Sequence, residues 1–198
     1  AVSRNLGKTW ERINSKQFTG FAHKIKEDPV NKNLLFLGCE SGLFATIDGG
    51  KNWFRMKNNL PEYALVRDLQ IHPKTNDLII ATHGRGIYIL DDIRTLRQLS
   101  ADVLKSNVHL FPTEAMILNN GPYGWGGPEV SGGWSAGNPS SQPAIMYYLK
   151  ERLTNGKVEI EIKDSLNNLI QTLPGTIRKG LNKVYWNLRE TPPKVASG

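Results

Sequence analysis

The sequence is poor in the features that mark disulfide-bonded, membrane-spanning and nucleic-acid-binding proteins. Cys39 is its only cysteine, so no disulfide can form within the chain. No stretch approaches the roughly 18 apolar residues of a membrane-spanning helix, so we expect no membrane span. The net charge is +7, but Lys and Arg are scattered without a long basic run. We therefore expect a solvated basic surface and no nucleic-acid partner.

Metal-binding and catalytic patterns are also missing. The four histidines lack the spacing of a metal site: His23, His72, His83 and His109. There is no Gly-x-Ser-x-Gly elbow and no phosphate-binding loop. Glycosidases need two facing carboxylates about 5 to 10 Å apart, whereas the adjacent Asp91 and Asp92 would point to opposite faces of a strand. We expect no metal, no cofactor and no catalytic residue in this chain.

Turn residues and repeated sequence are abundant instead. The chain has 19 Gly and 11 Pro, as an all-β fold with many turns requires. Residues 28–36 recur in similar form as residues 72–80, and Gly42-Leu43-Phe44 recurs as Gly86-Ile87-Tyr88, both at an offset of 44. A period near 44 residues in short β-type runs is typical of β-propeller blades.

The repeat predicts about two blades. We expect strands at residues 21–27, 34–39, 43–47 and 53–56 in one blade, and at 66–71, 78–82, 87–90 and 96–99 in the next. Residues 10–13 would be the outer strand of a blade that is mostly missing. Two blades cannot close a propeller, so we expect the chain to be the end of a longer one. Its open sheet edges should make it dimerise, swap strands or aggregate unless further blades are supplied.

A turn motif occurs twice, one blade apart. Residues 3–10 match residues 46–53 in the pattern Ser/Thr-x-Asp-x-Gly-x-x-Trp, with Asn at the acidic position of the first copy. The pattern resembles the Asp-box, also called the BNR repeat. Its polar side chain accepts hydrogen bonds from turn amides, its Gly permits a positive φ, and its Trp packs on the blade. We therefore expect these residues to be structural: Ser3, Asn5, Gly7, Trp10, Thr46, Asp48, Gly50 and Trp53.

The composition changes after residue 112. Residues 119–143 hold seven Gly, four Pro and two Trp, as a long loop would. Strand patterns follow at residues 144–149, 158–163, 169–173 and 183–188, which suggests a small β-sandwich. The sequence thus predicts an all-β chain with three parts: terminal propeller blades at 1–112, a Gly/Pro-rich connector at 113–143 and a sandwich at 144–198.

Residues 83–92 and 108–111 resemble the last blade of large exported bacterial proteins with BNR repeats. These proteins are often labelled glycosyl hydrolases, and their propellers are similar to those of sortilin and of xyloglucan-cleaving hydrolases. Asn138-Pro139 and Tyr147-Tyr148-Leu149 match the stretch that comes after the blade in these proteins. Residues 160–164, Gly180 and residues 182–186 resemble the Ig-like module of flagellar hook-capping proteins. The resemblance implies an exported protein, periplasmic, cell-surface or extracellular, with an Ig-like C-terminal sandwich.

Two groups of residues are candidates for ligand binding. His83 and Arg85 lie in a Gly-bounded turn, where the guanidinium could contact a sugar carboxylate or an acidic peptide. The alternative is that Arg85 pairs with a neighbouring acid and His83 merely fills the turn. Aromatic residues of the Gly-rich loop would either stack on sugar rings or dock the loop onto a neighbouring domain. They are Tyr123, Trp125 and Trp134.

Two functions stay open on the sequence, and a sortilin-like peptide receptor is a third possibility that shares the test of the first. In the first, the chain is a non-catalytic binding or structural module, whose partners are the missing blades of a parent chain or another protein chain, with a glycan or peptide as ligand. In the second, it is the accessory end of a polysaccharide-cleaving glycoside hydrolase whose catalytic carboxylates lie outside it. Activity of the longer protein on polysaccharides, with none from this chain, would support the second.

Overall fold

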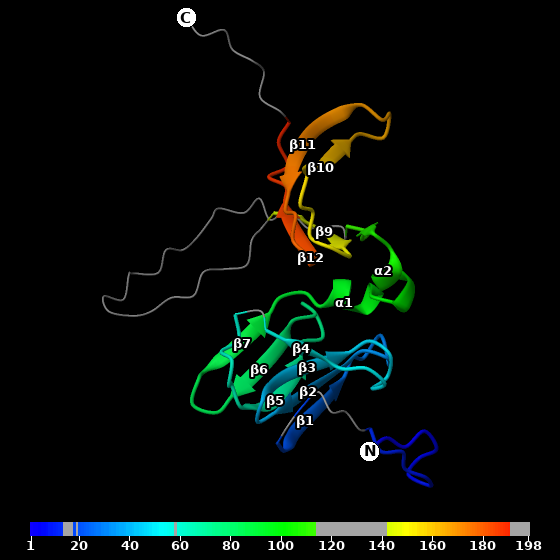
Figure 1. Ribbon diagram of the computed structural model, residues 1–198, viewed down its shortest axis with the longest axis vertical. Helices are drawn as coiled ribbons and strands as arrows, with labels where there is room; N and C mark the ends of the chain where they lie inside the picture. Colours follow the sequence, from blue (N-terminus) through cyan, green and yellow to red (C-terminus); the bar gives the residue numbers. More distant parts are fainter. Residues whose placement is uncertain (14–17, 19, 58, 114–141, 191–198) are drawn as a thin grey trace, which may run out of the picture. The chain divides into compact units, whose positions relative to one another are not determined.

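The structure is a computed structural model that describes residues 1–13, 18, 20–57, 59–113 and 142–190. Those residues form twelve strands and two five-residue helices, so the chain is mostly β, as expected. It divides into two compact units, Ala1–Ala101 and Asp102–Gly198. Figure 1 labels the elements of both units, each of which is described by itself below.

The first sheet of the N-terminal unit is a complete four-stranded blade. Its strands are antiparallel and follow the chain order, as a propeller blade requires. They are β1 (Ala22–Glu27), β2 (Leu35–Cys39), β3 (Gly42–Thr46) and β4 (Phe54–Met56). All four strands predicted for this blade are therefore confirmed, with ends that differ by a residue (Figure 1).

The second sheet has three strands in the same meander order: β5 (Val66–Ile71), β6 (Leu78–Thr82) and β7 (Ile87–Leu90). The fourth strand expected at residues 96–99 is wrong, because helix α1 (Arg94–Gln98) occupies this segment. Ile93, Leu96 and Leu99 are the buried residues here. They recur every three residues, which places them on one side of a helical turn and does not fit the alternation of a strand.

The outer strand expected at residues 10–13 is also wrong. The described residues have a single bridge there, between Val2 and Glu11, which exchange two backbone hydrogen bonds of 2.8 Å. A strand is stable only beside other strands of a sheet. Residues 10–13 belong to none of the sheets that the described residues form, so they cannot continue as one.

The two blades pack face to face through β2 and β5, which contact each other. Gly38 marks the closest approach, because a Cβ atom there would lie 2.6 Å from Cγ1 of Val66. Strand alternation places Phe36 on the same face as Gly38, and Leu43 and Ala45 pair beside them on β3. All three apolar side chains are buried. Each large one contributes about 1.5 to 3 kcal/mol to folding, so this interface holds the blades together.

The opposite face of the first blade is covered by the N-terminal segment. Alternate residues of β2 form an apolar cluster there with Phe44 and Trp53: Leu35, Leu37 and Cys39. Ile13 and Phe18 pack against this cluster. The Phe18 ring meets the rings of Phe44 and Trp53 edge-on, with centroids 5.8 and 6.0 Å apart. Both faces of the blade are therefore buried, which explains the continuous apolar runs of β2 and β3.

The C-terminal unit holds two small antiparallel sheets. Strands β8 (Val108–Leu110), β9 (Ala144–Leu149) and β12 (Gly180–Tyr185) form one sheet, in the order β12-β9-β8. Strands β10 (Val158–Lys163) and β11 (Leu169–Gly175) form the other (Figure 1). The boundary expected at residue 112 needs correction for β8, because β8 pairs with β9 and so belongs to this unit.

Candidate functional site

The first strands of the two blades, β1 and β5, lie side by side. Polar side chains pair across them, and each pair joins residues 44 positions apart, that is, equivalent residues of the repeat. Lys24 Nζ lies 3.0 Å from Asp68 Oδ1. Lys26 Nζ donates to Gln70 Oε1 at 3.1 Å. We call this set of pairs, together with His23 and Arg67, the inner ladder.

His23 and Arg67 form the third pair, with Nδ1 of His23 3.3 Å from Nη1 of Arg67. A guanidinium can only donate, so Nδ1 accepts and the ring proton of a neutral His23 lies on Nε2. That Nε2 atom is buried and has no hydrogen-bond partner within the described residues. Buried polar atoms are almost always paired. A donor in this position favours a ligand that brings an acceptor oxygen.

The inner ladder carries more positive than negative charge. Lys24, Lys26 and Arg67 are cationic, whereas Asp68 is the one acid among its members. The pKa of Asp68 lies below its ordinary value, chiefly because Lys24 donates a hydrogen bond to it, with a further one from the Leu69 amide. Exposed ion pairs of this kind contribute little to stability, because water and salt screen them.

The Asp-box of the first blade forms a hydrogen-bonded turn between β3 and β4. Thr46 Oγ1 donates to Asp48 Oδ1 at 2.7 Å and accepts from the Gly50 amide at 3.1 Å. Asp48 accepts from the amide of Asn52 at 2.9 Å and from its side chain at 2.7 Å. Trp53 is buried and its Nε1 donates to the Gly50 carbonyl at 3.1 Å. Gly50 has a φ of +94°, which favours glycine.

The hydrogen bonds at Asp48 also set its charge state. Partial burial by itself would raise the pKa of Asp48, but the backbone and side-chain hydrogen bonds from Asn52, with those from Thr46 and the Lys51 amide, outweigh it. The pKa is therefore lowered, and the carboxylate is ionised and fully engaged within its own turn. Such a group is suited to hold a turn and not to act as a general acid.

The N-terminal box makes the same turn with an uncharged side chain. Ser3 Oγ accepts from the Gly7 amide at 2.7 Å, and Asn5 Oδ1 accepts from the Thr9 amide at 2.9 Å. Asn5 Nδ2 donates to Thr9 Oγ1 at 2.8 Å, which takes the place of the Asp48–Asn52 side-chain contact. Trp10, however, is exposed. The turn therefore forms from local hydrogen bonds alone, without a blade beneath its tryptophan.

A buried ion pair joins the two blades away from the inner ladder. Arg97 of α1 donates to both oxygens of Asp28 at 2.8 to 3.0 Å, and the Asp28 side chain has no exposed surface. Arg97 Nη1 also donates to Asn76 Oδ1 of the second blade at 2.7 Å. Sequence reasoning missed this contact, since nothing in the 44-residue repeat links positions 28 and 97. The pair is structural, because its donors and acceptors are satisfied within it.

The structure describes two of the five ligand candidates from the sequence, His83 and Arg85. His83 and Arg85 lie in the exposed β6–β7 connection, and among the described residues neither side chain has a hydrogen bond or ion pair. The acid expected to pair with Arg85 is thus not found there, and ligand binding by this turn stays a prediction. Asp92 instead pairs with Arg94 at 2.7 Å. The aromatic candidates lie outside the described residues: Tyr123, Trp125 and Trp134.

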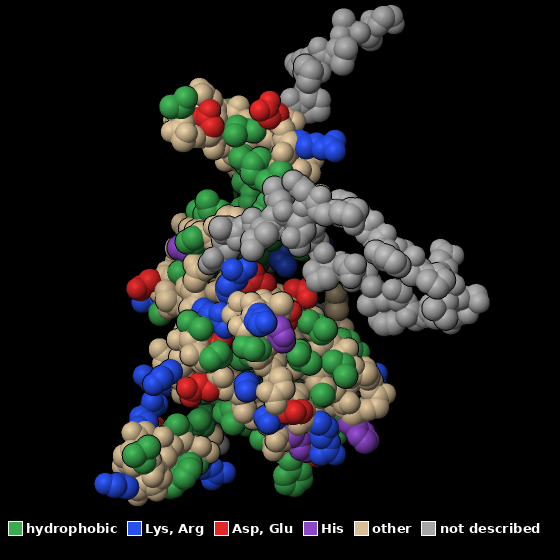
Figure 2. Space-filling view, turned by 180° about the vertical axis from the view of Figure 1, so that it is seen from behind, with side chains coloured by type: hydrophobic (Ala, Val, Ile, Leu, Met, Phe, Trp, Pro, Cys, Tyr) green, Lys and Arg blue, Asp and Glu red, His purple; other side chains and the backbone are tan. Residues whose placement is uncertain are grey.

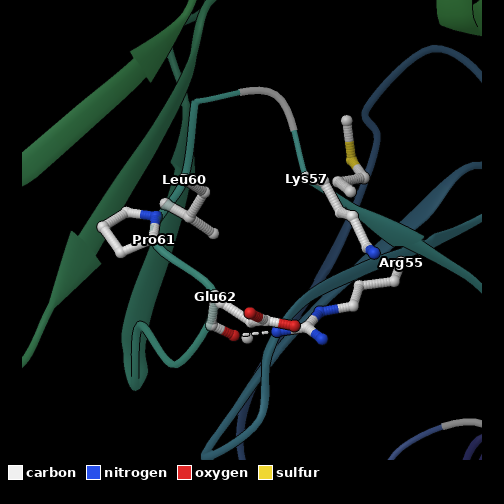
Figure 3. A pocket seen from close by; sticks show the side chains of 7 residues that line it. Arg55, Lys57, Leu60, Pro61 and Glu62 are labelled. Carbon is white, nitrogen blue, oxygen red and sulfur yellow. Dashed lines mark hydrogen bonds between the residues drawn. The ribbon is translucent and has the colours of Figure 1, made fainter.

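A small pocket of about 200 Å³ lies at the end of β4. Arg55 donates to the backbone carbonyl of Glu62, which ties the following loop to the strand. Figure 3 shows the Arg55 guanidinium directed at Glu62, with Lys57 nearby and Leu60 and Pro61 farther along the loop. The guanidinium is already engaged and the rim carries a carboxylate. Loop packing therefore explains the pocket without a ligand.

The surface and the described elements give no sign of a membrane span or a metal centre. Blue Lys and Arg side chains are spread over the face drawn in Figure 2, with red Asp and Glu among them. No helix in the described ranges has the length and apolarity to cross a membrane. Within those ranges no three His, Cys, Asp or Glu residues gather closely enough to hold a metal ion.

Two consecutive antiparallel blades that converge on their first strands define a propeller-type β domain. The sequence of residues 1–114 matches the Sortilin-Vps10 family, described as sortilin, neurotensin receptor 3. The match spans more than half of the chain, and the chain belongs to this family. No curated protein and no solved structure matches it significantly. The family match ends before β9, so the Ig-like module expected at residues 144–198 has no support and stays a prediction.

Proposed function

We propose that the chain is a non-catalytic binding module of a sortilin-like propeller, and that its inner ladder binds an acidic, extended peptide. The family description names a receptor, which is a binding function and not an enzymatic one. In a propeller the strands that converge line the central channel. An extended chain can follow such a wall, and its carboxylates meet the cations of Lys24, Lys26 and Arg67.

One observation carries the proposal. Along the inner ladder, equivalent residues of the two blades place more cationic hydrogen-bond donors than acidic acceptors side by side. Lys26 and Arg67 bond to the neutral groups of Gln70 and His23, so neither has a carboxylate among these contacts. The Nε2 atom of His23 adds a buried donor without a partner in the described part of the chain. Charge-assisted hydrogen bonds to carboxylates are the strongest that such donors can make.

The test is a titration with a fluorescent Glu/Gly decapeptide, followed by anisotropy at several salt concentrations. We expect binding that weakens as salt rises, and no binding of the matching Lys/Gly peptide. Replacement of Arg67 by Ala should weaken binding by about 10- to 150-fold, because a charged hydrogen bond is worth roughly 1.5 to 3 kcal/mol. Lys26→Ala should have a similar effect.

The matched control is Lys157→Ala, which removes an exposed lysine of the C-terminal unit that already pairs with Glu159. It should leave the affinity unchanged. Equal affinity of wild type and Arg67→Ala, or equal binding of both peptides, would overturn the proposal. If an acidic oligosaccharide bound in place of the peptide, the ligand would be a glycan, as the hydrolase-accessory alternative requires.

We further propose that the protein is exported and that further blades, supplied by a parent chain or another chain, complete the channel. The resemblance to exported BNR-repeat proteins supports export, and the two-blade N-terminal unit supports the need for more blades. Detection of the protein in periplasmic or culture fractions, with a cytoplasmic marker as control, tests the location. Recovery only with that marker would contradict export.

A further inference from the structure

Strand β7 has the form of an inner strand of a blade but lies at an edge. Its residues Ile87 and Ile89 are the repeat equivalents of Leu43 and Ala45 on β3. Leu43 is 2% exposed and Ala45 0%, whereas Ile87 is 71% and Ile89 61% exposed. The second blade packs on the face of Leu43 and Ala45, and β4 pairs with the outer edge of β3. Strand β7, by contrast, has no strand on its outer side within the described residues.

The backbone of β7 presents free hydrogen-bonding groups along that outer side. The Thr82 amide donates to the Gly86 carbonyl at 3.1 Å, so Thr82 and Gly86 form a hydrogen-bonded pair. Backbone groups of an antiparallel strand alternate between its two neighbours. Tyr88 therefore bonds to β6, whereas the N–H and C=O groups of Ile87 and Ile89 point away from the sheet.

The chain also holds a fourth strand without a sheet. Residues Trp10–Ile13 are the copy of Trp53–Met56 that follows the N-terminal Asp-box turn. Trp53 is 3% exposed beneath its turn, whereas Trp10 is 67% exposed. Glu11, the equivalent of Phe54, exchanges two backbone hydrogen bonds with Val2 and joins none of the sheets of the described residues. Within the described residues, then, β7 has no fourth strand beside it, and residues 10–13 match a fourth strand but lie in no sheet.

We propose that residues Trp10–Ile13 of a second copy of this chain add to the outer edge of β7 as its fourth strand. On the first blade Phe54 pairs with Ala45 and Met56 with Leu43. The same register places Glu11 of the second copy opposite Ile89 and Ile13 opposite Ile87. Glu11 gives up its two backbone bonds to Val2 for this pairing. Main-chain hydrogen bonds to the edge give affinity, as in other strand-addition complexes.

The donor strand and the acceptor edge cannot meet within one chain. Ile13 lies on the far face of the first blade, where its Cγ2 is 3.2 Å from the position of a Cβ at Gly50. That face is opposite to the one that packs on the second blade. A second copy must therefore supply the strand. Its Ile13 leaves the contact near Gly50 and pairs with Ile87 instead.

The test uses two proline variants that each remove one N–H which the added strand needs: that of Ile89, which points outward, and that of Glu11, which bonds to Val2 within one copy. Glu11→Pro blocks the donor strand, and Ile89→Pro blocks the acceptor edge, where proline is tolerated. Analytical ultracentrifugation should show wild type rising with concentration from 22.1 kDa, and each variant alone staying at that mass. An equal mixture of the two variants should form a 1:1 complex of about twice the mass, because one supplies the strand and the other the edge.

Leu110→Pro is the matched control, since Leu110 is also 61% exposed and lies on the edge strand β8. The Phe111 amide bonds to Met146, so the Leu110 amide also points outward. This variant should associate as wild type does. A monomeric wild type, association of either blocked variant alone, or a mixture that stays monomeric would each overturn the proposal. Complex formation in the mixture also shows that both variants are folded.

Discussion

At the residue scale, the buried side chain of Asp28 is held by a partner that is distant in the sequence. Its carboxylate has no exposed surface, and Arg97, 69 residues later, holds it with bonds to both oxygens. The amides of Val30 and Asn31 donate to it as well, at 3.0 and 2.7 Å. A buried charge that loses its partner is far more costly than an exposed pair that is broken.

We predict that Arg97→Ala lowers the free energy of unfolding by about 3 to 5 kcal/mol, because it leaves the Asp28 carboxylate buried and unpaired. Arg97→Lys should recover only part of the loss, since an ammonium cannot form the two-pronged contact. Urea unfolding followed by circular dichroism measures both. The control is Arg94→Ala, which breaks the half-exposed pair with Asp92 and should cost no more than about 1 kcal/mol. Equal costs for the two alanine variants would contradict the prediction.

The side-chain pair of one Asp-box can be placed in the other by mutation, because the two boxes make the same turn with different side chains. Asp48→Asn would set an amide N–H₂ against that of Asn52, so we expect a loss of about 1 kcal/mol. Adding Asn52→Thr recreates the Asn5–Thr9 contact of the other box and should restore most of the loss. Urea unfolding of the single and double variants at neutral pH provides the comparison. A double variant no more stable than Asp48→Asn would show that the two turns are not interchangeable.

The lowered pKa of Asp48 makes the same turn sensitive to acid. A carboxyl whose pKa is lowered on folding stabilises the fold above its unfolded pKa, and this contribution is lost as the pH falls through the folded pKa. The advantage of wild type over the Asp48→Asn, Asn52→Thr variant should therefore shrink below about pH 4. Unfolding midpoints at pH 7 and pH 3 test this. A difference that is the same at both pH values would contradict it.

At the scale of elements, the repeat located the four strands of the first blade and three strands of the second, but not their register. Glu27 pairs with Leu35, yet Ile71, 44 residues after Glu27, pairs with Leu78, which is only 43 after Leu35. The β6–β7 connection is longer than the β2–β3 connection, so the residues of β7 again lie 44 positions after their equivalents on β3. Sequence matching hid this shift, because β2 and β6 are apolar at consecutive positions and a one-residue slip still places apolar side chains on both faces.

The missed features share a physical reason: they depend on contacts between distant residues. The repeat favoured a fourth strand at residues 96–99, whereas the burial of Ile93, Leu96 and Leu99 on one side of a helical turn is seen only in the structure. The partner of Arg97 and the pairing of the inner ladder needed the blades to be placed in space. Local motifs fared better, since the hydrogen bonds of an Asp-box lie within a few residues of one another.

The register leads to a prediction about the blade interface. Gly38→Ala would place a methyl 2.6 Å from Cγ1 of Val66, so we expect it to destabilise the protein by about 1 to 3 kcal/mol. Ala81 occupies the same register position on the outward face of the second blade. Ala81→Val should therefore change the free energy of unfolding by less than about 0.5 kcal/mol. Urea unfolding of both variants decides, and a tolerated Gly38→Ala would contradict this packing.

At the scale of the whole molecule, the question is where the first unit ends. Sequence composition places the limit at residue 112, whereas the contacts place it between Ala101 and Asp102. Strand β8 decides between them. Val108 pairs with Leu149 and Leu110 with Tyr147 on β9, and Phe111, which is buried, donates its amide to Met146. The C-terminal sheet thus needs residues 108–111 to cover one edge of β9.

We predict that a piece of residues 102–190 unfolds cooperatively, whereas residues 113–190 have a much lower urea midpoint or no transition. Removal of β8 exposes an edge of β9 and deletes Phe111, and loss of a buried Phe alone costs about 3 to 5 kcal/mol. A piece that starts at residue 107 lacks the whole of α2 but keeps β8, so it should behave like residues 102–190. Conversely, residues 1–101 should be as stable as residues 1–112, because residues 102–112 add no strand to either blade. Equal midpoints for the pieces starting at 102 and 113 would return the boundary to residue 112 and make β8 dispensable to the sheet in which it lies.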